Sequence, residues 1–322
     1  MDFVGFVADF QGTIIVNRQP PDITQLQTLP LAELMRHALA TKLAHRGTSF
    51  SLCSIINAKS GRCSEDCRCC AQSAHYRTEA PVYPLLDKDQ VLSAAREAKK
   101  IGASRFSLVT SGRGPAGDDL PQVLETIRAI RKEVGIKVCA SLGILGKSEL
   151  GQLKEAGLSR YHHNLETSRE FFPRICTTHG FDDRVNTIRA AQAVGLAVCS
   201  GGIFGLGESE TDRLSMAMSL AEYGIDSVPI NVLIPLPGTP CAGLPPLAIT
   251  EILRAIALYR LIMPRSAIRL AAGRESALAD FLSSAFMGGA DGMMIGGYLT
   301  QRGRSPEADL QFAGQIKQLW ST

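Results

Sequence analysis

Short apolar runs alternate with amphipathic helical stretches along this chain from Ser51 onward. The apolar runs predict eight strands, over residues 51–57, 105–111, 136–142, 160–166, 197–203, 227–234, 267–273 and 292–298. Between them, apolar residues recur every three or four positions, and most of these segments close with a glycine. This spacing predicts helices, among them residues 87–102, 119–135, 182–196 and 211–224.

The regular strand-and-helix repeat indicates the fold class. Eight such units, with no linker or change in composition between them, favour a single (β/α)8 TIM-type barrel of the α/β class over two domains. Residues 1–45 are predicted to form an N-terminal extension, with a leader that carries no motif and an amphipathic helix from Leu31 to His45. We therefore expect a leader and helix at residues 1–45 and the barrel at residues 46–322.

The alternation within each strand predicts which side chains enter the barrel lumen. Successive side chains of a barrel strand point alternately to the helices and to the lumen. In residues 136–142, Ile136, Val138 and Leu142 form the apolar outward set, which turns Cys139 and Ser141 inward. The same rule turns six more residues inward: Cys53, Ser107, Asn164, Cys199, Asn231 and Arg269. A lumen built only for stability would carry Val, Ile and Leu, so this lumen is predicted to be functional.

Composition and charge exclude several classes of protein. The 322 residues are 45% hydrophobic, which is sufficient for a large core. The 34 basic and 31 acidic residues are well mixed, so neither a nucleic-acid nor a membrane surface is expected. The N-terminus carries Asp2 and Asp9 without a basic segment, and no apolar run reaches ~18 residues, so we expect neither export nor a membrane span. Nine cysteines in this arrangement favour the reducing cytoplasm.

A cysteine-rich loop follows the first predicted strand. Cys63, Cys67 and Cys70 form a C-x3-C-x2-C array among polar and charged residues. Clustered thiolates bind soft metals, and three ligands leave the fourth tetrahedral position open, which in a [4Fe-4S] cluster leaves one iron free for a small molecule. The alternatives are a redox dithiol or a zinc loop, although zinc loops usually bring a second Cys/His pair.

The spacing of this array resembles that of the radical S-adenosylmethionine (SAM) enzymes. In that superfamily the open iron chelates the amino and carboxylate groups of SAM, and an electron then cleaves SAM to a 5′-deoxyadenosyl radical. The residue before the last ligand is commonly aromatic in the superfamily, whereas this chain has Cys69. Either Cys69 or Cys70 therefore remains possible as the third ligand, and the spacing favours Cys70.

Longer stretches resemble the biotin synthase family and follow in family order: GRCSEDCRCCAQS, KVCASLG, YHHNLETS, CSGGIFGLGE, VPINVLIPLPGTP and IRLAAGRE. The resemblance covers about 270 of the 322 residues. It implies SAM-dependent insertion of sulfur into dethiobiotin to form biotin, with the sulfur donated by an auxiliary iron–sulfur cluster in the barrel. It further implies a [4Fe-4S] cluster, an electron donor such as flavodoxin or ferredoxin, and a homodimer.

The resemblance places the auxiliary cluster on Cys139, Cys199 and Arg269. The remaining family cysteine falls at Ser107, and a serine hydroxyl is a poorer, harder ligand for iron. An additional inward thiol, Cys53, lies on the strand next to that of Ser107. Cys53 and Ser107 thus both remain candidates for the fourth ligand, we favour Cys53, and the cluster is either the family's [2Fe-2S] form or a variant.

The remaining site residues are also implied by the resemblance. The SAM site would consist of Arg184, Glu166, His163, Gly201, Gly202 and Ile203. Asn164 and Asn231 would hydrogen-bond the ureido ring of dethiobiotin, because a carboxamide donates and accepts hydrogen bonds without carrying charge. No catalytic acid or base is predicted, since the cofactors carry the difficult chemistry.

Two other functions remain as alternatives. One is another radical SAM enzyme on the same barrel, such as a hydrogenase maturase or an amino-acid mutase relative, and sulfur in the product would distinguish it. Such relatives are not expected to combine the lumen cysteines with Arg269, Asn164 and Asn231. The other is an iron–sulfur protein without turnover, which would need no SAM site and would not cleave SAM.

Overall fold

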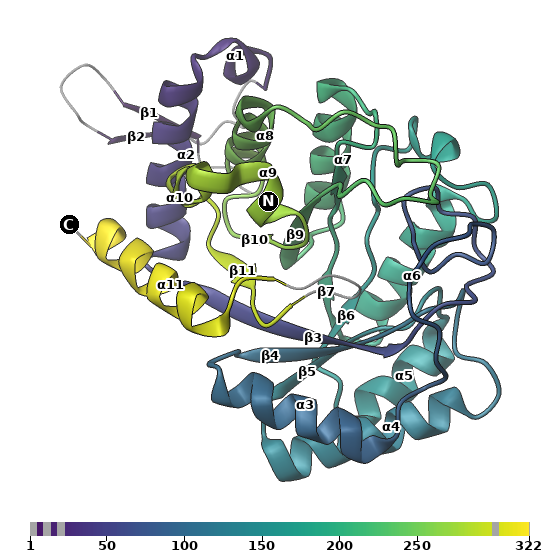
Figure 1. The fold of residues 1–322 in the computed structure, drawn as a ribbon. Helices are drawn as coiled ribbons and strands as arrows, with labels where there is room; N and C mark the ends of the chain where they lie inside the picture. Colours follow the sequence, from purple (N-terminus) through teal and green to yellow (C-terminus); the bar gives the residue numbers. More distant parts are fainter. Residues whose placement is uncertain (1–4, 9–13, 18–22, 298–302, 322) are drawn as a thin grey trace.

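Parallel strands close into a barrel in the computed structural model, which describes residues 5–8, 14–17, 23–297 and 303–321 (Figure 1). Strand β10 pairs with both β9 and β11, and β11 pairs with β3, which closes the ring. The strands are β3 Ser51–Lys59, β4 Arg105–Thr110, β5 Lys137–Ser141, β6 Arg160–His162, β7 Ala197–Cys199, β8 Gly202–Phe204, β9 Ser227–Val232, β10 Ala267–Leu270 and β11 Gly292–Met294. Since β7 and β8 both pair with β9 and share one barrel position, the predicted (β/α)8 barrel is confirmed.

Each predicted strand coincides with an observed one, but six of them end earlier than predicted, and the run at residues 197–203 is divided between β7 and β8. The run at residues 160–166 is a strand only to His162, and Glu166, which has a left-handed backbone with φ of 71°, makes an isolated bridge to Gly202. The last strand ends at Met294, and residue 298 of its predicted range lies outside the described residues.

The helices lie between the strands in sequence and on the outside of the barrel (Figure 1). Their bounds are α1 Ile23–Thr28, α2 Leu31–Arg46, α3 Lys88–Lys100, α4 Asp119–Ala129, α5 Lys147–Ala156, α6 Phe181–Ala193, α7 Glu210–Glu222, α8 Ile249–Ile262, α9 Arg274–Leu278, α10 Leu282–Met287 and α11 Pro306–Ser321. The start of α3 is set by a capping box, in which Asp87 accepts from the Gln90 backbone N–H at 2.9 Å and Gln90 accepts from that of Asp87 at 3.2 Å.

The four helices named from the sequence pattern are confirmed as α3, α4, α6 and α7. The one predicted over residues 119–135 continues beyond α4 as a π-helical turn, Ile130–Val134. Gly135 ends this turn in the left-handed conformation with φ of 69°, which is the C-terminal signal that the sequence carries.

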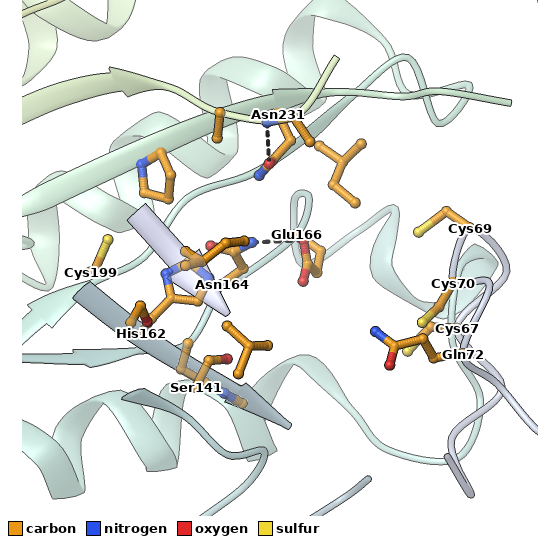
Figure 2. Close-up of a pocket in the computed structure, with 18 of the residues that line it drawn as sticks. Cys67, Cys69, Cys70, Gln72, Ser141, His162, Asn164, Glu166, Cys199 and Asn231 are labelled. Carbon is orange, nitrogen blue, oxygen red and sulfur yellow. Dashed lines mark hydrogen bonds between the residues drawn. The ribbon is translucent and has the colours of Figure 1, made fainter. Parts of the chain in front are cut away.

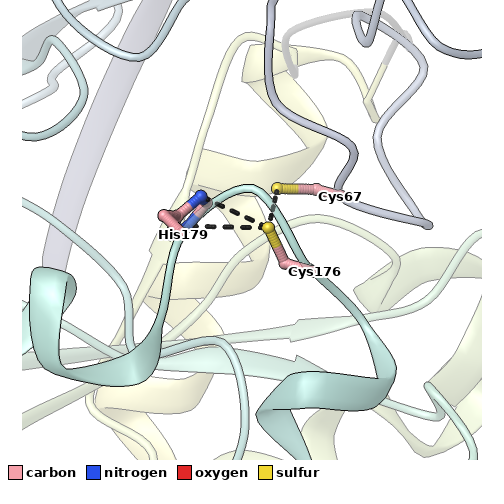
Figure 3. A group of neighbouring side chains, drawn as sticks. All are labelled: Cys67, Cys176 and His179. Carbon is pink, nitrogen blue, oxygen red and sulfur yellow. Dashed lines mark hydrogen bonds between the residues drawn. The ribbon is translucent and has the colours of Figure 1, made fainter.

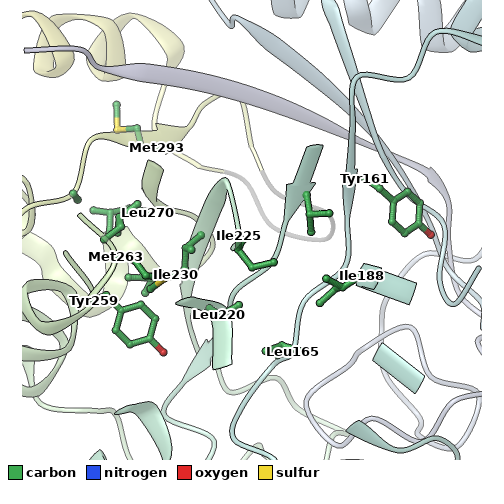
Figure 4. Close-up of a cluster of buried hydrophobic side chains, with 14 of the residues drawn as sticks. Tyr161, Leu165, Ile188, Leu220, Ile225, Ile230, Tyr259, Met263, Leu270 and Met293 are labelled. Atoms are coloured by element: carbon green, nitrogen blue, oxygen red, sulfur yellow. The ribbon is translucent and has the colours of Figure 1, made fainter. Parts of the chain in front are cut away.

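The hydrophobic core lies between the strands and the surrounding helices (Figure 4). Outward-facing Phe106, Leu108 and Val138 are each about 1% exposed, as the alternation predicts. Tyr161 is fully buried among them, and burial raises the pKa of its hydroxyl. That hydroxyl donates to the carbonyl of Gly143 at 2.6 Å, so the polar tip of the ring is satisfied inside the core.

The N-terminal extension packs against the barrel rather than standing apart from it. Helix α2, which the sequence predicts from Leu31, contacts α8, and buried Lys42 places its Nζ 2.9 Å from the ring centroid of Trp320 in α11. Ahead of α2, the backbone of the predicted leader forms an antiparallel hairpin of β1 Gly5–Ala8 and β2 Ile14–Asn17. The rest of that leader, residues 1–4, 9–13 and 18–22, lies outside the described residues. In the described part of the chain, no helix has the length and apolar character needed to cross a membrane.

Candidate active site

A cavity of about 470 Å³ joins the cysteine loop to the barrel lumen (Figure 2). All eight residues that alternation turned inward line it: Cys53, Ser107, Cys139, Ser141, Asn164, Cys199, Asn231 and Arg269. The prediction of a polar, thiol-bearing lumen is therefore confirmed. The loop contributes Cys63, Cys67, Cys69 and Cys70 to the same cavity, so both sets of thiols face one space.

The cysteine loop follows β3, at the carboxyl end of the barrel strands where active sites of such barrels lie. Its backbone is held by the hydrogen bonds from the N–H of Cys63 to the carbonyl of Gln72 at 3.0 Å and from the N–H of Cys70 to that of Cys67 at 3.0 Å. Figure 2 shows the side chain of Cys69 apart from those of Cys67 and Cys70. Internal hydrogen bonds thus give the loop its shape.

A second segment, Cys176–His179, holds the loop from outside. Asp66 accepts hydrogen bonds from the backbone N–H groups of Thr177 at 2.8 Å and Thr178 at 3.2 Å. Burial would raise the pKa of Asp66, but these bonds and that of the Thr177 hydroxyl outweigh it and lower the pKa. The carboxylate of Glu65, the neighbouring loop residue, pairs with Nδ1 of His179 in the same segment. Sequence reasoning missed this segment because it lies 110 residues from the loop and carries no pattern of its own.

The thiols of Cys67 and Cys176 lie 3.8 Å apart, with Cys67 donating to Cys176 (Figure 3). This hydrogen bond raises the pKa of Cys67 and lowers the pKa of Cys176. Cys67 is therefore held as the thiol, and the sulfur of Cys176 accepts its hydrogen bond.

The deep end of the cavity combines thiols with guanidinium groups. Burial would raise the pKa of Cys199, but a hydrogen bond with His162 and the charges of Arg160 and Arg269 lower it to about 6, so Cys199 is mainly a thiolate at neutral pH. Burial lowers the pKa of Arg269, whereas interactions with the nearby sulfur atoms of Cys53 and Cys199 and a hydrogen bond with Cys53 raise it, and the net shift of the pKa is upward. Opposite charges are thus gathered in the lumen.

Two lumen arginines, Arg105 and Arg160, were missed from the sequence. Both line the cavity, and Nε and Nη1 of Arg160 are buried with no hydrogen-bond partner among the described residues, as is Nε of Arg269. The signal was present, because Arg160 has the parity of Asn164 and Arg105 has that of Ser107. Buried guanidinium nitrogens without a partner are costly unless an anionic group meets them, so this end of the cavity fits an iron–sulfur cluster with thiolate ligands.

Glu166 lies between the cysteine loop and the lumen. Its N–H donates to the carbonyl of Gly201 at 3.1 Å, and its own carbonyl accepts from the N–H of Ile203 at 2.9 Å, which fixes its left-handed conformation. Nη1 of Arg184 lies 3.6 Å from the Glu166 carboxylate and donates to the carbonyl of Asn164 at 2.9 Å. The carboxylate and the guanidinium are therefore held together in a fixed geometry.

The glycine-rich segment packs so closely against neighbouring backbone that Gly201 and Gly202 leave no room for a side chain. A Cβ at Gly201 would lie 1.9 Å from the carbonyl oxygen of Pro229, and one at Gly202 would lie 2.4 Å from that of Glu166. Ile203 then lines the cavity. His163 also lines it, and burial lowers the pKa of His163, so its imidazole is neutral and its Nε2 has no partner in the described part of the chain.

The two asparagines of the lumen are oriented by the backbone around them. Asn164 accepts from the N–H of Gly201 at 3.1 Å, and Asn231 donates to the carbonyl of Gly202 at 3.1 Å and accepts from the N–H of Ala272 at 3.1 Å. A carboxamide has two N–H donors and two acceptor lone pairs. Each asparagine therefore keeps donor and acceptor capacity for a bound ligand.

Three cysteines on a loop at the carboxyl end of a (β/α)8 barrel define a radical SAM enzyme, and the family model of the Radical SAM superfamily matches residues 58–220. A second family model, the Biotin and Thiamin Synthesis associated domain, matches residues 229–316.

The fold is similar to that of methylornithine synthase, with a TM-score of 0.79, 20% identity and coverage of 92% of this chain and 91% of that chain. It is also similar to HydG, a maturase of the [FeFe]-hydrogenase, with a TM-score of 0.78, 17% identity and coverage of 90% and 69%. At such identities these likenesses show the fold alone.

Comparison with individual relatives identifies the family of this chain within the superfamily. It is 53% identical over 287 residues to the biotin synthase of Pelotomaculum thermopropionicum, covering 89% of each chain. It is 50% identical over 302 residues to the biotin synthase of Heliobacterium modesticaldum, covering 94% of this chain and 93% of that relative. The chain therefore belongs to the biotin synthase family. Membership implies a [4Fe-4S] cluster, SAM and an auxiliary iron–sulfur cluster as cofactors, and the thiols and buried guanidinium groups of the cavity fit them.

Proposed function

We propose that this chain inserts sulfur into dethiobiotin to form biotin, with the residues of the central cavity in the roles described below. The observation that carries the proposal is that the cysteine loop and the lumen set of Cys139, Cys199 and Arg269 face one cavity. When bound, the cofactors supply a 5′-deoxyadenosyl radical and the sulfur. The protein contributes placement, electrostatics and exclusion of water.

Cys63, Cys67 and Cys70 are the proposed ligands of the [4Fe-4S] cluster. Their spacing supports this assignment, as does the separation of Cys69 from Cys67 and Cys70 in Figure 2. Glu65, held by His179, keeps the loop in place when the ligand thiols become thiolates. Three ligands from one loop leave a coordination position for SAM.

Cys139, Cys199 and Arg269, with Cys53 as fourth ligand, are proposed to hold the auxiliary cluster in its [2Fe-2S] form or a variant of it. The hydrogen bond and charge interaction of Arg269 with Cys53 support Cys53 as a member of this group. Cys53 is also close enough to Cys139 to contribute to the raised pKa of that thiol, which is mainly due to burial. Ser107, which lies opposite Cys139 in the strand register, remains the alternative ligand.

The SAM site is proposed to lie on the segment that follows β6 and on β8. Arg184 would meet the carboxylate of SAM, with Glu166 and His163 beside it. Gly201 and Gly202, which leave no room for a Cβ, would bring the backbone and Ile203 to the adenine side. The contact of Arg184 with Glu166 supports a preformed site.

Asn164 and Asn231 are proposed to bind the ureido ring of dethiobiotin, because their carboxamides are already oriented by backbone hydrogen bonds. Apolar residues of the loop after β9 line the same cavity: Leu233, Ile234 and Leu236. These side chains would exclude water from the carbon atoms that react. Fixed placement matters because a carbon radical must meet its partner before it is quenched.

We further propose a homodimer and an electron donor such as flavodoxin or ferredoxin, as the family resemblance implies. Cytoplasmic location is proposed because all nine cysteines are free thiols, which a reducing compartment preserves. Residues 46–322 are proposed as the catalytic unit, with residues 1–45 as an accessory extension.

The test is a turnover assay on anaerobically reconstituted protein with SAM, dethiobiotin and reduced flavodoxin. We expect 5′-deoxyadenosine and biotin from the wild type and neither from Cys63→Ala. SAM cleavage without a sulfur-containing product would indicate another radical SAM reaction, such as that of a maturase or mutase relative. Absence of SAM cleavage in a protein with a full [4Fe-4S] cluster would favour an iron–sulfur protein without turnover.

A further inference from the structure

Three side chains that could hold a metal ion lie together in the wall of the cavity, and two of them have no ligand role in the proposed reaction. Cys67, Cys176 and His179 place one ligand atom each within 4.8 Å of one another (Figure 3). Cys176 is 3% exposed and His179 is 8% exposed. Cys176 and His179 come from the segment that holds the cysteine loop, so the tertiary structure brings together ligands from two parts of the chain.

The distances within this group match a tetrahedral site. A metal that binds two sulfur atoms at about 2.3 Å each in tetrahedral geometry holds them about 3.8 Å apart. The sulfur atoms of Cys67 and Cys176 are 3.8 Å apart. The Cys176 sulfur lies 3.2 Å from Nδ1 and 3.9 Å from Nε2 of His179. A metal that binds the sulfur and Nε2 requires about 3.6 Å between them, with Nδ1 on the far side of the ring, so the imidazole must turn to complete the site.

The two ring nitrogens of the His179 imidazole have different partners. Its Nδ1 pairs with the carboxylate of Glu65, which also accepts a hydrogen bond from the hydroxyl of Thr178 at 2.8 Å. A carboxylate on one ring nitrogen, which fixes the tautomer and leaves the other nitrogen for the metal, is the usual arrangement around metal-binding histidines. Glu65 thus has the position of a supporting residue of a metal site.

An entry path reaches the group from outside the cavity. Cys176 lines both the central cavity and a separate surface hollow of about 410 Å³. Asp66 and Thr177 line the same hollow. A cation can therefore reach the sulfur of Cys176 without passing through the barrel lumen.

We propose that the cluster-free chain binds one thiophilic divalent cation, Zn²⁺ or Fe²⁺, through Cys67, Cys176 and Nε2 of His179, with water as the fourth ligand. Both sulfur atoms bind as thiolates, any thiol proton is released to solvent, and the two thiolates neutralise the charge of the cation. Because Cys67 is also a proposed ligand of the [4Fe-4S] cluster, the cation and the cluster exclude one another. This exclusion rests on the proposed function, whereas binding of the cation does not.

The first experiment measures the site without the cluster. The variant Cys63→Ala/Cys70→Ala/Cys139→Ala/Cys199→Ala lacks ligands of both proposed clusters and keeps the proposed site, and Co²⁺ replaces Zn²⁺ as the spectroscopic probe. We expect one Co²⁺ per chain, with tetrahedral visible bands and thiolate charge-transfer absorption. Adding Cys176→Ala should remove the charge-transfer absorption and weaken binding more than about tenfold, and so should His179→Ala. Adding Cys241→Ala, which removes a buried thiol outside the group, should leave both unchanged.

Unchanged Co²⁺ affinity and absorption after Cys176→Ala and after His179→Ala, in chains that circular dichroism shows to be folded, would overturn the proposal. The second experiment reconstitutes the [4Fe-4S] cluster with and without one equivalent of Zn²⁺. We expect Zn²⁺ to suppress reconstitution of the wild type and to have little effect on Cys176→Ala. Equal suppression of both proteins would contradict the shared site. Reconstitution of Cys176→Ala without Zn²⁺ reports separately on the proposed roles of Cys63, Cys67 and Cys70.

Discussion

Asn164 donates a hydrogen bond from Nδ2 to Oε2 of Glu166 at 3.2 Å (Figure 2). Arg184 contacts both residues, since its Nη1 lies 3.6 Å from the Glu166 carboxylate and donates to the carbonyl of Asn164 at 2.9 Å. A proposed substrate ligand and two proposed SAM ligands therefore form one connected group. A change of charge at Glu166 is expected to affect both sites.

We predict that Glu166→Gln weakens SAM binding about tenfold. Glutamine keeps the size of the side chain and an acceptor oxygen, but it removes the charge that holds Arg184, and hydrogen bonds to charged groups contribute about 1.5–3 kcal/mol. Calorimetric titration of SAM into the reconstituted protein measures the effect. Glu170→Gln, at an exposed position, is the matched control. An unchanged dissociation constant for Glu166→Gln would show that this carboxylate takes no part in SAM binding.

We predict that Cys53→Ala reduces the iron and sulfide of the auxiliary cluster and the yield of biotin, whereas Ser107→Ala leaves both close to wild type. The reason is that a thiolate is a much better ligand for iron than a hydroxyl. Mössbauer spectroscopy with iron and sulfide counts distinguishes the two clusters. The opposite result would assign the fourth ligand to Ser107. A single [4Fe-4S] cluster in the wild type and both variants would remove the internal sulfur donor.

We predict that Arg160→Met stabilises the cluster-free chain by about 1–4 kcal/mol while it lowers the content of auxiliary cluster. Two nitrogens of this guanidinium are buried without a partner among the described residues, and an apolar side chain removes that cost. Denaturant unfolding of the cluster-free protein measures the free energy of unfolding. Arg128→Met, at an exposed position, should change it by less than about 0.5 kcal/mol. Destabilisation by Arg160→Met would mean that the lumen satisfies this cation without a cluster.

We predict that Lys42 makes the stability of the chain rise with pH above neutrality. Burial lowers the pKa of Lys42 from 10.5 to about 7, so between these values the unfolded state binds more protons than the folded state. The free energy of unfolding should therefore increase with pH across this window by about 1.4 kcal/mol per pH unit and be independent of this group below it.

Urea unfolding of cluster-free protein from about pH 6.5 to about pH 9 tests this dependence. Lys42→Met should lose the slope, and Lys132→Met, at an exposed position, should keep it. Parallel curves for the wild type and Lys42→Met would show that Lys42 stays charged, held by its bond to the carbonyl of Gly47 and by the ring of Trp320.

Local patterns were sufficient for the fold and for much of the cavity. Strands and helices follow from the period of apolar residues, and the direction of Cys139 or Asn231 follows from parity, because both are properties of a few consecutive residues. The end of β6 at His162 was not predictable in this way. The left-handed backbone of Glu166 depends on hydrogen bonds to Gly201 and Ile203, which are distant in sequence.

By itself, the sequence determined the barrel, the cysteine loop, the polar lumen and the family resemblance, since each depends on spacing along the chain. Only the tertiary structure decided that Glu65 pairs with His179 and that Cys176 meets Cys67. Contacts between residues far apart in sequence depend on how strands register and loops pack. That information is distributed over the whole core, so no single motif carries it.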